Sequence, residues 1–345
     1  MDIAVILPAL TALLALVFSV ALFDQWLERR RGFQLIWAIG MLFFAVASGS
    51  EAIGALLGWN EAVYRAWYLT GAVWTAAWLG LGTAYLLGRT RFGYAYAALV
   101  LLGGLIVFVA RNRYPDAGSL PVLLLIAALI VALAIAVETY FQNERWPQIA
   151  ALAVALASVA AAVVAVSQPL VGGSFALDPR TGIPTGEAIP CAERLLSLLL
   201  NVPGGLALGL GALFSAYIFM PKKRVLDYSL DAGQSGDEFL FNLLIAPVAI
   251  AVNFFASLPT AIVALVTGRI HSRVPATLLI GTGALVASST DALSRLGSTD
   301  LFQVGKFVGV LLIFVGFLIS VEVFREIRIP FTSRVLRGAR TERAG

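Results

Sequence analysis

Two ionisable residues, Glu51 and Arg65, stand inside long apolar runs of the sequence. An ionisable side chain at the centre of a membrane span costs about 2.5–3.5 kcal/mol, so it usually pairs with another charge or faces a wet cavity. Glu51 lies in the second apolar run and Arg65 near the start of the third, with the turn between them near Trp59. Antiparallel helices would bring both residues to a similar depth. We predict an ion pair, which serves either as a gate or ligand site or as a structural lock of the hairpin.

Asp291 is a further candidate, because it directly follows three hydroxyl residues, Ser288 to Thr290, near the end of a later apolar run. A carboxylate lined by hydroxyls can hold a cation or a proton within a membrane. Arg295 stands one helical turn further on, and such an i,i+4 pair contributes only about 0.3–0.5 kcal/mol. The alternative is therefore a polar cluster at a helix end near water.

Aromatic residues of the third apolar run recur at spacings of seven, four and seven, as Trp67, Trp74, Trp78 and Tyr85. These spacings predict one stripe along a single helix face. The stripe could line a groove for a lipid- or quinone-sized molecule, with Trp74 and Trp78 at its centre. The alternative is core packing combined with anchoring of the rings at the membrane interface.

The segment Asn201-Val202-Pro203-Gly204-Gly205 interrupts the apolar run 195–220. Proline removes a helix donor and a glycine pair lets the backbone swing, so this segment could break the span. A broken span can present carbonyl groups or a half-helix end to a substrate, as in discontinuous transporter helices. The alternative is a packing kink, and the Gly205-x-x-x-Gly209 spacing favours close contact with another helix.

Residues 239–268 form an apolar run that is interrupted by Asn253 and by two prolines, Pro247 and Pro259. As one helix the run would be about 45 Å long, which exceeds the hydrocarbon core of about 30 Å. A single crossing would also place the basic residues before and after the run on opposite sides. We predict that the run does not cross. It either enters and returns as a hairpin with Asn253 to Pro259 at its tip, or lies flat at the interface.

The chain contains one cysteine, Cys191, and one histidine, His271. A single thiol excludes an intrachain disulfide and a multi-cysteine metal site, and a single imidazole argues against haem ligation or a His-rich metal centre. We therefore expect no cofactor and no bound metal. The net charge of +4 comes from basic residues in short loops and the tail. That pattern predicts contact with anionic lipid headgroups and not with nucleic acid.

The elements that must position these residues are membrane helices. Hydrophobic residues make up 60% of the chain and charged residues 13%, against about 25% charged in soluble domains. We expect an all-α, polytopic transmembrane helix bundle with about nine spans, at 3–23, 33–57, 63–87, 94–110, 121–141, 147–171, 195–220, 275–293 and 303–324. We divide the chain into a seven-helix block (1–220), a cytoplasmic loop with the re-entrant or interfacial segment (221–274), two C-terminal transmembrane helices (275–324) and a basic cytoplasmic tail (325–345).

The stretches Ala62 to Leu87 and Phe239 to Pro275 resemble uncharacterised multi-pass bacterial membrane proteins, in which a seven-helix block precedes extra C-terminal helices. The resemblance implies the fold and carries over no functional residue. The breaks in the apolar runs favour passage or binding of a small solute or a lipid-like molecule. The alternative is a non-catalytic scaffold, sensor or complex subunit with membrane-protein partners. An enzyme is not indicated, because nothing ties Glu51, Asp291 and Ser288 into one site.

The basic residues also predict the topology in the cell inner (plasma) membrane. Arginine and lysine concentrate at 29–31, at 222–224 and between 325 and 343, and such groups stay in the cytoplasm. The N-terminus should therefore lie outside and the C-terminus inside.

In a Cys191→Ser background, an Arg340→Cys variant should react with a membrane-impermeant maleimide only after the cells are opened. Labelling of intact cells would contradict this topology.

Overall fold

The computed structural model describes residues 3–179, 182–230, 236–295, 302–320, 327–328, 330–332 and 335–337, with side chains between 273 and 295 described up to residue 287. The helices are α1 (Ile3–Arg29), α2 (Gly32–Leu57), α3 (Glu61–Trp67), α4 (Ala76–Leu86), α5 (Phe92–Ala110), α6 (Leu120–Tyr140), α7 (Trp146–Ser167), α8 (Cys191–Phe219), α9 (Gly236–Val266), α10 (Arg273–Arg295) and α11 (Phe302–Ile319). A π-helical stretch, η1 (Tyr68–Thr75), joins α3 to α4, and two short strands, β1 (Ile327–Arg328) and β2 (Val335–Arg337), pair in antiparallel fashion.

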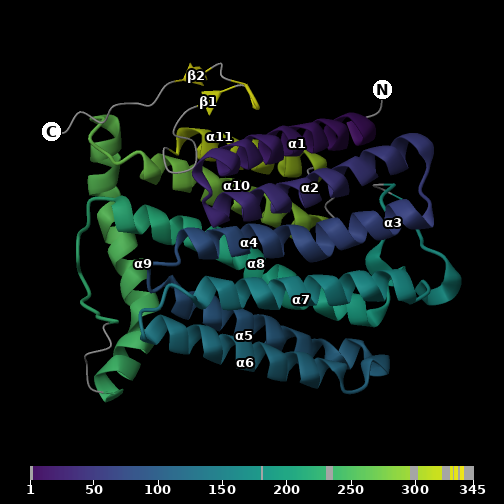
Figure 1. Cartoon of the computed structure of the whole chain (residues 1–345), viewed down its shortest axis with the longest axis horizontal. Helices are drawn as coiled ribbons and strands as arrows, with labels where there is room; N and C mark the ends of the chain where they lie inside the picture. Colours follow the sequence, from purple (N-terminus) through teal and green to yellow (C-terminus); the bar gives the residue numbers. More distant parts are fainter. Residues whose placement is uncertain are drawn as a thin grey trace.

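The chain is a polytopic helix bundle, as predicted. Eight of the described helices are long and apolar enough to cross a membrane, namely α1, α2, α5, α6, α7, α8, α9 and α11. The rod formed by α3, η1 and α4, and the shorter apolar helix α10, run beside them (Figure 1). The rods that lie along the common axis correspond to the nine spans expected from the sequence.

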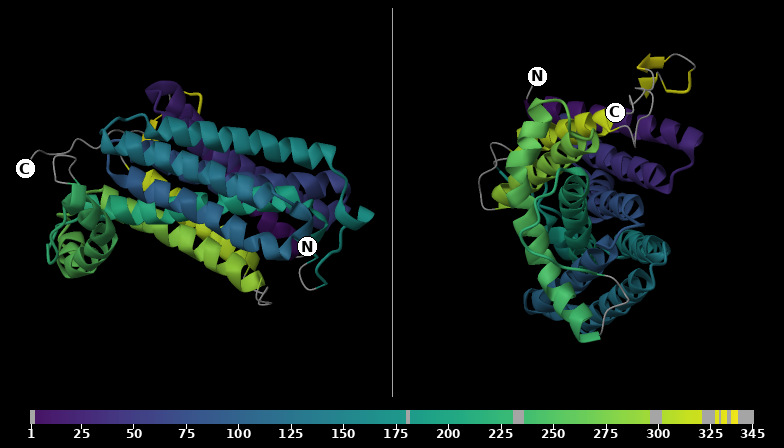
Figure 2. Two further views of the ribbon diagram at one scale, coloured as in Figure 1. Left: turned by 90° about the horizontal axis from the view of Figure 1, so that it is seen from below. Right: turned by 90° about the vertical axis from the view of Figure 1, so that its left-hand side faces the viewer.

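Helix α9 departs from this arrangement, because it crosses one end of the bundle transversely (Figure 1). The view along the bundle in Figure 2 shows the same placement. We call this end the α9 end, and we call the opposite end, which carries the 168–190 loop between α7 and α8, the loop end. Residues 236–266 form one continuous helix that contains both Pro247 and Pro259. The re-entrant hairpin is therefore wrong, and the orientation of α9 agrees with the flat alternative.

A proline is tolerated inside α8 as well. This helix runs without a break from Cys191 to Phe219, with Pro203 inside it. Of the two interpretations of this segment, the broken span is therefore wrong and the packing alternative agrees with the structure. Gly204 lies against the backbone of α4, where an added Cβ would be 2.6 Å from the Cα of Ala77. Gly205 and Gly209 have open space beside them. The Pro-Gly segment is thus a packing device, and its contact glycine is Gly204 and not the Gly205–Gly209 pair.

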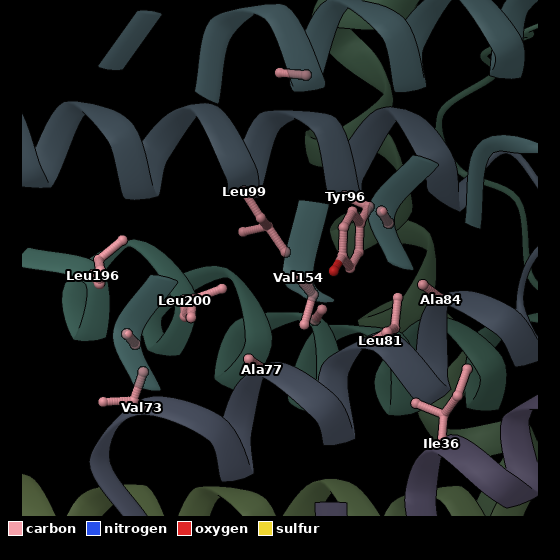
Figure 3. Close-up of a cluster of buried hydrophobic side chains, with 14 of the residues drawn as sticks. Ile36, Val73, Ala77, Leu81, Ala84, Tyr96, Leu99, Val154, Leu196 and Leu200 are labelled. Atoms are coloured by element: carbon pink, nitrogen blue, oxygen red, sulfur yellow. The ribbon is translucent and has the colours of Figure 1, made fainter. Parts of the chain in front are cut away.

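The helices enclose two main apolar clusters. One lies between η1, α4, α5, α7 and α8, and Figure 3 shows side chains converging there from each of these elements, including Val73, Leu81, Tyr96, Val154 and Leu200. The other lies between α1, α2, α10 and α11, around the buried rings of Phe18, Trp37 and Phe317. Lipid tails are as apolar as these side chains, so close packing rather than the hydrophobic effect holds the helices together.

The crossing of α4 and α8 can be tested at adjacent glycines. Gly204→Ala should destabilise the protein by about 1–3 kcal/mol, because the new methyl group meets backbone atoms that cannot move aside. Gly205→Ala is the matched control, since it adds the same methyl group where nothing lies within 4 Å. Thermal unfolding in detergent measures both. Equal effects of the two substitutions would contradict the described crossing.

Candidate functional site

Glu51 is buried and fully paired, but not with Arg65. Its carboxylate lies 2.8 and 2.9 Å from the Lys306 Nζ of α11, and it accepts hydrogen bonds from Trp67 Nε1 at 2.8 Å and from Gln303 Nε2 at 3.0 Å. Its exposed fraction is 3%, and that of the Lys306 side chain is 12%. The predicted Glu51–Arg65 pair is therefore wrong. A lysine from the last span takes the place of the arginine.

Arg65 faces a different neighbour, the end of α7. Its guanidinium bonds Glu61 one turn earlier at 2.7 Å, the carbonyl of Gln168 at 2.9 Å and the carbonyl of Ala165. The last carbonyls of a helix have no partner within the helix and carry the negative end of its dipole. Arg65 thus caps α7. Arg65 and Glu51 therefore point toward different helices.

Trp74 and Trp78 contact α7 and α2. Their indole N–H groups donate to the carbonyl and the hydroxyl of Ser158, both at 3.2 Å, and the ring of Phe43 lies 4.7 and 5.8 Å from their centroids. Trp67 donates instead to Glu51. The three indoles therefore have acceptors within the bundle, which fits packing between helices better than a ligand groove.

The side chains of Asn201 and Asn253 both form hydrogen bonds with backbone groups. Asn201 and Ser197 of α8 both donate to the carbonyl of Ala72, which lies in the π-helical stretch, with Ser197 Oγ at 2.6 Å. Asn253 accepts from two backbone N–H groups of the chain that follows α8 and donates to the carbonyl of Leu226 at 2.7 Å. They lie on different helices and share no site. The side chain of Asp291 lies outside the described residues.

Glu193, in the first turn of α8, carries a carboxyl group that the sequence did not single out. The residue is 0% exposed, and neither carboxyl oxygen has a hydrogen-bond partner among the described residues. Arg65 lies close enough for the two charges to interact, but its guanidinium is bonded to Glu61 and to the end of α7. A buried carboxyl group without a partner is rare and calls for an explanation by a proton, an ion or a ligand.

Polar groups gather around Glu193. Tyr64, which is 0% exposed, donates from its hydroxyl to the carbonyl of Thr185 at 2.7 Å, and the hydroxyl of Tyr68 bonds Ser197. Two more buried atoms have no partner among the described residues, Thr185 Oγ1 and Arg194 Nε. The charges of Glu193 and Arg194 both act on Tyr64, so these groups lie in one region. We call Tyr64, Tyr68, Thr185, Glu193 and Ser197 the Glu193 cluster.

The 168–190 loop covers this cluster. Trp59, just before α3, donates from Nε1 to the carbonyl of Gly182 at 3.0 Å, and Phe175 stacks on Tyr64 with ring centroids 4.6 Å apart. Ile189, just before α8, is completely buried. The cluster is therefore closed on the side of the loop end by chain that is not part of any span.

The cluster combines one carboxyl group with hydroxyl groups and aromatic rings, and the guanidinium groups of Arg65 and Arg194 lie in the same region. No group of three or more His, Cys, Asp or Glu side chains that could hold a metal ion occurs in the part of the chain that the structure describes. No protein-family model, curated protein or solved structure matches this chain.

The Glu51–Lys306 contact can be tested by a double-mutant cycle. Glu51→Gln leaves a buried ammonium group without its counter-charge, so we expect a loss of about 3–5 kcal/mol, and Glu51→Gln/Lys306→Gln should lose clearly less than the sum of the single losses. The control is the pair Arg89–Glu144, whose side chains are 81% and 61% exposed and should couple by less than about 1 kcal/mol. Additive losses at Glu51 and Lys306 would rule out the pair.

Proposed function

We propose that this multi-pass membrane protein binds a small cationic solute at Glu193 and that this binding is a step in passage of the solute across the membrane. The observation that carries the proposal is the Glu193 carboxyl group, buried and without a hydrogen-bond partner among the described residues. Ionisable groups of this kind inside membrane bundles commonly mark ion and substrate paths.

A cation at Glu193 should carry one charge, because the guanidinium groups of Arg65 and Arg194 act on the same region and would repel a more highly charged ion. The carboxyl group supplies the charge, the hydroxyl groups of Tyr64, Tyr68 and Ser197 supply acceptors, and aromatic rings attract cations through their faces. A calcium ion needs six to eight oxygen ligands, usually with several carboxylates. With one carboxyl group in the described cluster, a proton, an alkali ion or a small amine fits better.

Passage is supported by the position of the cluster and by the helix beside it. If the basic residues of the α9 end lie in the cytoplasm, the loop end faces the outside and Glu193 is the first buried charge that an entering solute meets. The neighbouring stretch Tyr68–Thr75 is π-helical, a form often found at functional sites. The broken seventh span and the re-entrant hairpin no longer support passage.

Binding can be measured on the purified protein in nanodiscs. Thermal unfolding is followed while choline chloride is exchanged for the chloride of sodium, potassium or methylammonium at constant ionic strength, and over a range of pH. A ligand at about 100 times its Kd adds about 2.7 kcal/mol of stability. At least one cation should raise the Tm of the wild type by several degrees, and Glu193→Gln should abolish the rise.

The matched control is Glu187→Gln, which removes an exposed carboxyl group from the same loop end. It should leave the cation response intact. Uptake of the responding cation into proteoliposomes then separates passage from binding. If no cation stabilises the wild type, or if Glu193→Gln responds like the wild type, the proposal is wrong and the scaffold or subunit alternative is favoured.

A further inference from the structure

Helix α9 leaves a long apolar face uncovered. The exposed face includes Leu240, Phe241, Leu244, Val248, Phe255 and Val266, and Leu244 is 79% exposed. The opposite face carries small and polar residues, and the buried ones are Ala246, Ala249, Asn253, Ser257 and Ala261. Helix α9 crosses the end of the bundle transversely (Figure 2). If the bundle axis runs along the membrane normal, α9 lies parallel to the membrane surface and its apolar face lies at interfacial depth.

The polar side of α9 is covered by the segment 221–230, which we call the strap. Lys223 N–H donates to Ser257 Oγ at 2.8 Å, Val225 and Leu226 donate to Asn253 Oδ1 at 2.7 and 3.0 Å, and Ser229 donates to Asn242 at 3.3 Å. In Figure 1 the strap runs along the side of α9 that faces away from the bundle. The strap thus forms hydrogen bonds with the polar side chains of α9. The apolar face on the other side of the helix is left available to lipid.

Positive charge gathers on the strap that covers the polar side of α9. Lys222, Lys223 and Arg224 of the strap are exposed, and none of them pairs with a carboxylate within the described part of the chain. Arg269, directly after α9, is exposed as well. The bond between Lys223 and Ser257 places the three strap residues at the C-terminal half of α9.

The acidic residues of α9 lie elsewhere. Asp237 and Glu238 stand in its first turn, about 30 Å along the helix from Ser257. Within the strap, the exposed carboxylate of Asp227 offsets one of the three basic charges. Tyr228 stays neutral, because burial, with a smaller contribution from Tyr217, raises its pKa to about 12. The C-terminal half of α9 therefore combines an apolar face with a basic rim.

We infer that α9 and the strap form a binding site for an anionic phospholipid. Its acyl chains lie against the exposed face of α9, and its phosphate lies among Lys222, Lys223, Arg224 and Arg269. An amphipathic helix in the interface plane binds through buried apolar area together with attraction to anionic lipids. Basic residues next to a membrane span attract anionic headgroups in the same way. The inference does not depend on the role proposed for Glu193.

The charge requirement is tested with the full-length protein in nanodiscs of phosphatidylcholine, with or without phosphatidylglycerol. The wild type should unfold several degrees higher in the anionic discs. The variant Lys222→Gln/Lys223→Gln/Arg224→Gln should lose most of that difference. The matched control, Arg111→Gln/Arg113→Gln, removes exposed arginines from the loop end. It should show the same difference in unfolding temperature between the two kinds of disc as the wild type. An unchanged difference in the strap variant, or an equal loss in the control, overturns the inference.

Two further measurements identify the occupant. Inorganic phosphate added to phosphatidylcholine discs should not reproduce the stabilisation, and if it does, the site binds free phosphate and not a lipid. In a Cys191→Ser background, a spin label at Leu244→Cys should be accessible to oxygen and shielded from a water-soluble paramagnetic reagent. Accessibility to the water-soluble reagent would show that the face of α9 lies in water and is open to a protein partner, which overturns the lipid site even if the strap variant fails to fold.

Discussion

The bilayer core offers no water, so each polar group that the chain buries there must find its partner inside the protein. Several contacts between helices of this bundle follow from that constraint. Glu51 is held by groups from α3 and α11, and the carbonyl of Ala72 receives two donors from α8. These contacts join helices that are far apart in the sequence. They therefore fix the arrangement of the spans relative to one another and not only the spans themselves.

Close approach of backbones is the second consequence of a lipid solvent, because apolar side chains gain little by leaving apolar lipid. Gly204 lets α8 reach the backbone of α4, and Gly283 and Gly309 do the same between α10 and α11. The proline beside Gly204 is compatible with an unbroken α8. A sequence pattern that is typical of a discontinuous transporter helix here produces a tight helix crossing.

Glu193 and helix α9 both depart from these rules. Glu193 is a buried carboxyl group without a partner among the described residues, at the end of the bundle that the 168–190 loop covers. Helix α9 lies across the opposite end with an uncovered apolar face and a basic strap. Departures from local rules tend to occur where a protein functions. One end of the bundle would then bind a solute, and the other would bind lipids at the membrane surface.

The sequence by itself determined the class of protein and the approximate bounds of its apolar helices, because such a helix depends on about 20 consecutive residues. It predicted that 239–268 does not cross the membrane, but it left the hairpin and the flat helix as alternatives. Only the tertiary structure decided that Glu51 meets Lys306, 255 residues away, that Arg65 caps α7, and that a folded loop buries Glu193. Hydropathy reports how deep a residue lies along its own helix. Which neighbour it faces depends on how the helices pack side by side, and that is set by contacts between distant parts of the chain.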